Sequence, residues 1–135
     1  MANLFEMFGT DKALETEGIW YEFDKETKFR LARAGGANMR FAKALEAKTR
    51  PYRRQIENGT IDNDLANSLL REAFAETVLL DWKGVSGPDG VALEYSAANA
   101  VKLFEQLPDL FTELQNEATR LSNFRNEQVE ADAGN

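Results

Sequence analysis

Residues 61–80 read IDNDLANSLLREAFAETVLL, and this stretch carries the strongest helix pattern in the chain. Its apolar residues recur every three or four positions from Ile61 to Val78. That spacing places a wide apolar stripe on one face of a helix, as is typical of a helix packed against a core. Asp62 is a favourable residue to begin such a helix, because its carboxylate can accept hydrogen bonds from the first free N–H groups. We therefore predict a core helix over residues 62–80.

A second helical pattern covers residues 38–57 and is interrupted at Pro51. Proline removes a backbone donor and disfavours helical backbone at the residue before it, so we expect a break or kink there. Asn38 is the expected N-cap of this segment.

Two more helices are predicted at residues 96–107 and 108–127. Ser96 is a favourable N-cap for the first, and Pro108 suits the first turn of the second because its fixed φ matches the helix.

Residues 19–33, IWYEFDKETKFRLAR, have a different pattern. Aromatic and β-branched residues precede the polar stretch 24–27, and apolar and basic residues alternate after it. This is typical of a β-hairpin, in which Phe29 and Leu31 face the core. The fold class is therefore mainly α (α+β): a compact helical domain with an N-terminal β-hairpin.

We expect one domain over residues 1–127 and a flexible, acidic tail at residues 128–135, which are polar and contain one large aliphatic residue. The predicted core consists of apolar side chains on the inward faces of these elements: Leu31, Phe41, Leu45, Leu65, Leu69, Phe74, Val78, Phe104, Leu110, Phe111, Leu114 and Leu121.

Several classes of chemistry are excluded by composition. The 135 residues include no Cys and no His, so thiolate nucleophiles, Ser-His-Asp hydrolysis and imidazole or thiolate zinc sites cannot be built from this chain. Its aspartates lie mostly in cap and turn positions, which does not suggest a catalytic pair. We expect no enzymatic activity, no catalytic residues, no cofactor and no metal.

The chain also has no apolar stretch long enough for a membrane span, and its first residues do not resemble a signal peptide. We therefore expect a soluble, intracellular protein without a membrane partner.

Charge is distributed unevenly along the chain. Residues 28–54, the basic block, contain nine basic residues against Glu46 alone, so the block carries +8 and the rest of the chain −15 within a total of −7. The interpretation that we favour is a solvated face paired with acidic helices. The alternatives are a protein-binding surface and a small nucleic-acid- or phosphate-binding module. The overall acidity argues against nucleic acid as a partner.

Three segments resemble those of a known family: residues 29–38 (FRLARAGGAN), 46–54 (EAKTRPYRR) and 107–111 (LPDLF). They are similar to small tail assembly chaperones of long-tailed bacteriophages and prophages, and the likeness extends from about Phe5 to about Asp132.

The resemblance implies a non-enzymatic protein of the host bacterial cytoplasm that is absent from the mature virion. Such a protein binds the tape measure protein and keeps it soluble while the tail tube assembles. In such families a frameshifted longer form can recruit the tail tube protein, which would be a further partner. Self-association and a role as another phage tail or head-completion protein stay open.

A tape measure protein is largely a long amphipathic helix, so we expect it to dock in an apolar groove between helices of the chaperone. The last two predicted helices supply the candidate wall: Phe104, Leu107, Phe111 and Leu114. Arg50, Arg53 and Arg54 would steer acidic segments of the client. The alternative is that all four apolar residues belong to the core.

Overall fold

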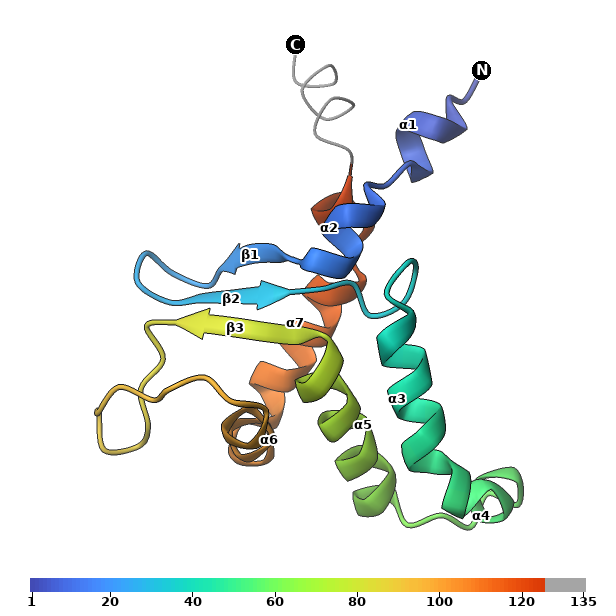
Figure 1. Ribbon diagram of the computed structural model, residues 1–135, viewed down its shortest axis with the longest axis vertical. Coiled ribbons are helices and arrows are strands. Elements are labelled where there is room, and N and C mark those ends of the chain that lie inside the picture. Colours follow the sequence, from blue (N-terminus) through green and yellow to red (C-terminus); the bar gives the residue numbers. More distant parts are fainter. Residues whose placement is uncertain (126–135) are drawn as a thin grey trace.

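The structure is a computed structural model, and it describes residues 1–125 (Figure 1). In chain order its elements are α1 (Leu4–Phe8), α2 (Lys12–Glu17), β1 (Ile19–Glu22), β2 (Lys28–Leu31), α3 (Met39–Thr49), the 3₁₀ turn η1 (Arg50–Tyr52), α4 (Arg53–Glu57), α5 (Asn63–Thr77), β3 (Leu79–Lys83), α6 (Ala97–Gln106), α7 (Pro108–Thr119) and the 3₁₀ turn η2 (Leu121–Phe124). The predicted fold class, a mainly helical α+β domain with an N-terminal hairpin, is confirmed.

The sheet is antiparallel with the order β1-β2-β3, so β2 is the central strand. Phe29 pairs with Trp82 across β2 and β3, and both side chains are buried, as is Leu31. Arg30 lies between Phe29 and Leu31 and is only partly buried. The predicted alternation along the second strand is therefore correct.

The third strand corrects the prediction that one helix covers residues 62–80. Helix α5 ends at Thr77, and Leu79 already pairs with Leu31 of β2. A short run of apolar residues fits a helix and a strand equally well by local pattern, and the open edge of β2 decides in favour of the strand. Leu79 and Trp82 are consequently both buried, and Leu79 is a core residue that the sequence did not predict.

Helix α5 is the centre of the core. It packs against α3, α6 and β3, while α7 contacts β2 (Figure 1). The Phe74 ring meets the rings of Phe41, Phe104 and Phe111 edge-on, with centroids 6.5, 5.8 and 5.2 Å apart. Such edge-to-face pairs stabilise a core beyond the area that they bury.

Seven of the predicted core residues are buried: Leu31, Leu69, Phe74, Val78, Phe104, Phe111 and Leu114. The other five are only partly buried: Phe41, Leu45, Leu65, Leu110 and Leu121.

The predicted helix starts are mostly correct. Asp62 and Ser96 accept hydrogen bonds from the N–H groups of Leu65 and Asn99, and the chain passes through η1 at Pro51, where the break was expected. Asn38 is the exception. Its side chain makes no cap; it is buried and its Nδ2 donates to the carbonyl oxygens of Arg33 and Thr77, which joins the end of the hairpin to the end of α5.

The last helix is shorter than predicted. It ends at Thr119 rather than near residue 127, because Arg120 is extended and the side chain of Asn123 donates to the carbonyl oxygen of Glu117. The end of the predicted domain and the predicted tail at 128–135 lie outside the described residues.

Two short N-terminal helices, α1 and α2, were not predicted. Helix α1 projects from the body in Figure 1, and none of its side chains is buried. Helix α2 is held more firmly, since Asp11 caps it and Glu15 is buried against the rest of the protein.

Candidate functional site

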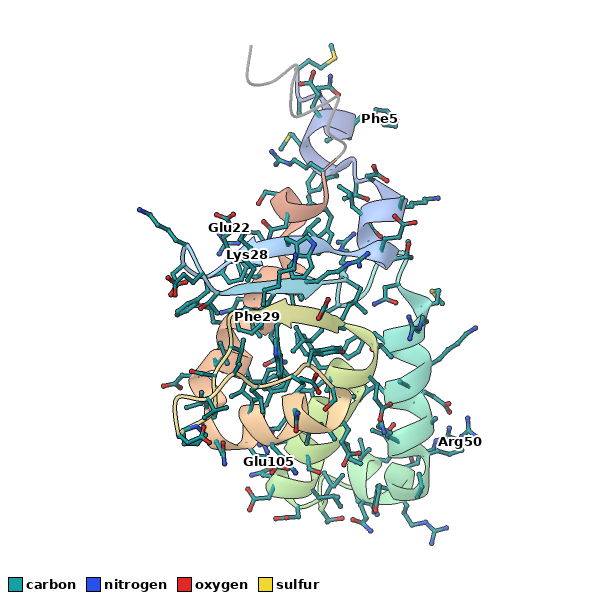
Figure 2. All side chains as sticks on the ribbon, turned by 60° about the vertical axis from the view of Figure 1, so that its left-hand side comes forward. Phe5, Glu22, Lys28, Phe29, Arg50 and Glu105 are labelled. Carbon is teal, nitrogen blue, oxygen red and sulfur yellow. The ribbon has the colours of Figure 1, made fainter. Side chains whose placement is uncertain are left out.

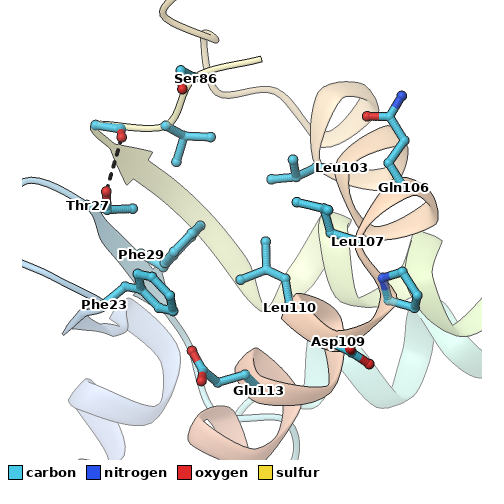
Figure 3. Close-up of a pocket in the computed structure, with 13 residues that line it drawn as sticks. Phe23, Thr27, Phe29, Ser86, Leu103, Gln106, Leu107, Asp109, Leu110 and Glu113 are labelled. Carbon is cyan, nitrogen blue, oxygen red and sulfur yellow. Dashed lines mark hydrogen bonds between the residues drawn. The ribbon is translucent and has the colours of Figure 1, made fainter. Parts of the chain in front are cut away.

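An apolar groove of about 640 Å³ lies where the β1–β2 turn, the segment after β3 and the junction of α6 with α7 meet (Figure 3). We call it the junction groove. It is lined by Phe23, Thr27, Phe29, Gly84, Val85, Ser86, Leu103, Gln106, Leu107, Pro108, Asp109, Leu110 and Glu113.

The helical wall of the groove follows from one proline. Pro108 begins α7, so the chain turns at Leu107, which lies between α6 and α7 and has backbone angles that are not helical (φ −126, ψ 73). Leu107 therefore cannot join either helix in the core, and 50% of its surface stays exposed. Leu103 and Leu110, about one turn away on either side, are buried or half-buried and form the floor.

The opposite wall is the turn of the hairpin. Asp24 accepts hydrogen bonds from the N–H groups of Glu26 and Thr27 at 2.8 and 2.7 Å, and these bonds hold the pKa of its carboxyl below the usual value. Thr27 in turn donates its hydroxyl to the carbonyl oxygen of Gly84 at 3.2 Å, as Figure 3 shows. The turn is thus fixed to the end of β3, and Phe23, which is 52% exposed, lines the groove from the hairpin side.

The charged side chains among the described lining residues, Asp109 and Glu113, are both acidic. Glu113 Oε2 accepts a hydrogen bond from the Tyr21 hydroxyl at 3.3 Å. Burial and the nearby Glu113 charge raise the pKa of Tyr21, so this phenol remains a donor at neutral pH. The groove therefore combines apolar walls with an acidic edge.

Of the four apolar residues predicted to form the wall of a client-binding groove, three are core residues and one lines the groove. Phe104 and Leu114 are fully buried and Phe111 is 7% exposed, so these three belong to the core and are not available to a partner. Leu107 alone of the four is exposed, and it lines the groove. The reason is the break at Pro108, which turns the face of α7 that follows toward α5.

The predicted arginines lie elsewhere. Arg50 and Arg53 both form ion pairs with Glu46, and Arg54 is exposed on α4. In Figure 1 the hairpin turn lies at the left and α4 at the lower right, and Figure 2 likewise places Phe29 and Arg50 on different sides. The structure does not bring these arginines to the groove.

Pairing extends through the basic block. Lys28 pairs with Glu22, Arg33 with Glu15, and Lys48 with Glu72 and Glu76, so five of its nine cations, with Arg50 and Arg53, contact carboxylates. This supports the interpretation of the block as a paired, solvated face.

Sequence reasoning missed most of the groove. Phe23, Val85 and Leu110 come from three separate parts of the chain, and no local pattern shows that they meet. The sequence feature that could have indicated the groove is the Leu107–Pro108 junction, because the proline leaves the apolar Leu107 outside both helices.

Two kinds of feature are absent from residues 1–125. No group of three or more acidic side chains there is placed to hold a metal ion. None of the helices in that range is both long enough and apolar enough to cross a membrane.

Comparison with known families places the chain among prophage proteins, since residues 36–135 match one such family. The chain belongs to the family described as YdaY prophage protein. The match includes β3, α6 and α7, and so the helical wall of the groove, but not the hairpin. No curated protein and no solved structure matches the chain significantly.

Proposed function

We propose that this prophage protein is a tail assembly chaperone, which binds the tape measure protein and keeps it soluble while the tail tube assembles. The observation that carries the proposal is the junction groove, an open apolar surface whose edges, Phe23 and Leu107, are each half-exposed. Membership of a prophage family and the resemblance to tail assembly chaperones supply the biological setting.

The docking mode follows from the shape of the surface. An amphipathic client helix would place apolar anchors, spaced at i, i+3, i+4 and i+7, over Leu107 and Phe23. Leu103 and Leu110 then form the floor beneath the anchors. Burial of the two exposed edges would contribute roughly 25 cal/mol for each Å² of apolar surface removed from water.

In this role the protein acts by binding and not by catalysis. It works in the host cytoplasm and leaves before the virion is complete. A frameshifted longer form would bring the tail tube protein to the same client.

The proposal is tested by co-expression with the tape measure protein of the same prophage. The wild type should raise the soluble fraction of that protein above the level without chaperone. Leu107→Ser should lose most of this effect, because it removes an apolar anchor while serine is a good N-cap for α7. The matched control is Ile56→Ser, at an exposed apolar residue of α4 outside the groove.

Two results would contradict the proposal. Tape measure protein that is equally insoluble with and without the wild type removes the chaperone function. Equal activity of Leu107→Ser and the wild type removes the groove as the site.

A further inference from the structure

We propose that the junction groove selects client segments in which Lys or Arg residues flank the apolar anchors. Asp109 and Glu113 bind these cationic side chains. This inference rests on the proposed function of the groove as the client site. It reverses the expectation from the sequence that the chaperone would attract acidic client segments.

The first support is the position of the two carboxylates. Both lie on α7 with a spacing of i, i+4, which places their Cβ atoms about 5–6 Å apart on one side of the helix. Both line the same groove as Leu107 (Figure 3). A helix that places an apolar side chain over Leu107 therefore brings its flanking residues to these carboxylates.

The second support is that Glu113 is held in place. The Tyr21 hydroxyl donates to its Oε2 and fixes one oxygen toward β1. Each carboxylate oxygen has more than one acceptor site, so Glu113 can still accept from a cation of the client. A fixed acceptor loses less conformational freedom on binding than a mobile one.

The third support is the charge of the surroundings. The charged side chains among the described lining residues of the groove, Asp109 and Glu113, are both acidic, whereas Arg50 and Arg53 are paired with Glu46 at α3 and α4. Steering by the groove side of the molecule therefore favours a cationic partner.

An open groove also suits a segment of chain better than a small enclosed ligand. Leu107 and Phe23 are each half-exposed at its edges, so a small molecule would leave apolar surface in water. A helix covers both edges at once and reaches the acidic residues beyond them.

The experiment uses two synthetic amphipathic helical peptides with identical apolar anchors. One carries Lys and the other Glu at the flanking positions, and each is titrated with the full chain by fluorescence anisotropy. At low salt the wild type should bind the Lys peptide about 2- to 10-fold more tightly, as expected for two ion pairs at a groove edge. The preference should shrink as ionic strength rises.

Two variants distinguish an effect of Asp109 and Glu113 themselves from an effect of the net charge of the protein. Asp109→Asn/Glu113→Gln should abolish the preference and leave binding of the Glu peptide unchanged or stronger. Glu17→Gln/Glu57→Gln removes the same charge at exposed positions outside the groove and should retain the preference.

Equal affinity of the wild type for both peptides would overturn the inference, as would a preference that survives in Asp109→Asn/Glu113→Gln. Absence of binding by either peptide, with the tape measure protein still solubilised in co-expression, would overturn the inference and leave the chaperone function standing. Failure of the co-expression itself would remove the function.

Discussion

Glu15 shows how a single buried charge organises the N-terminal part of the molecule. Its carboxylate is 2% exposed and accepts hydrogen bonds from the Thr10 hydroxyl, the Ala37 N–H and Arg33 Nη1, the last at 2.9 Å. Gly36, at φ +55, passes so close to the pair that a side chain there would collide with both Glu15 and Arg33. One carboxylate thus joins α2 to the loop that leads into α3.

Burial by itself raises the pKa of Glu15, but the hydrogen bonds from Thr10, Ala37 and Arg33 and the charge of Arg33 outweigh it. The pKa in the folded protein lies below the ordinary 4.5. The resulting stabilisation is therefore complete above the unfolded-state pKa, and it is lost as the pH falls through the folded-state pKa.

Replacement of Glu15 by Ala should lower the free energy of unfolding by about 2–4 kcal/mol near neutral pH, because it leaves a half-buried arginine and two other donors without their acceptor. The control Glu17→Ala, at an exposed position of the same helix, should change it by less than about 0.5 kcal/mol. Urea unfolding measures both. The gap between wild type and Glu15→Ala should narrow as the pH falls below the ordinary pKa; a gap that widens in acid would contradict this account.

At the scale of elements, helices were easier to predict than the strand that completes the sheet. The breaks at Pro51 and before Pro108 and the caps Asp62 and Ser96 are local signals, and the structure confirms them. Strand β3 has no such signal, because its partner β2 lies about fifty residues earlier in the chain. Long-range pairing converts the predicted end of a helix into a strand.

Gly84 joins two walls of the groove. Its φ is +71, and a Cβ there would collide with the carbonyl group of Glu26 in the hairpin turn. The absence of a side chain therefore lets the end of β3 approach the turn closely enough for the hydrogen bond from Thr27 to form.

Gly84→Ala should lower the free energy of unfolding by about 2–4 kcal/mol, from left-handed backbone strain and a clash with the rigid backbone. Gly90→Ala is the matched control: its φ is +78, but nothing lies within 4 Å of its Cβ position. It should lose only about 1–2 kcal/mol, through backbone strain alone. Thermal and urea unfolding compare the two, and equal losses would show that the close approach at Gly84 does not matter.

At the scale of the whole molecule, the apolar residues and the arginines of the predicted binding site do not lie together. Leu107 lines the groove, whereas Phe104, Phe111 and Leu114 are core residues and the three arginines lie at the other side (Figures 1 and 2). Helical periodicity identifies an apolar face but does not reveal which part of that face another element covers. The groove depends on contacts between segments about 80 residues apart, such as Phe23 and Leu107, which only the fold shows.

The fold also changes the interpretation of the charge distribution. In the sequence, residues 28–54 form a run of cations suited to phosphate or an acidic partner. In the fold, five of the nine cations contact carboxylates from α2, β1, α3 and α5. The structure thus supports a paired, solvated face, and in the groove two acidic side chains lie beside exposed apolar ones.

The most direct measurement of the central claim, that the groove holds the tape measure protein, is site-specific photo-crosslinking in the co-expressed complex. The photoreactive residue p-benzoylphenylalanine replaces Leu107 in one variant and Ile56, the exposed apolar residue of α4, in the other. We predict that irradiation links position 107 to the tape measure protein and that position 56 gives little or no such product. Crosslinks from position 56 without crosslinks from position 107 would contradict the account.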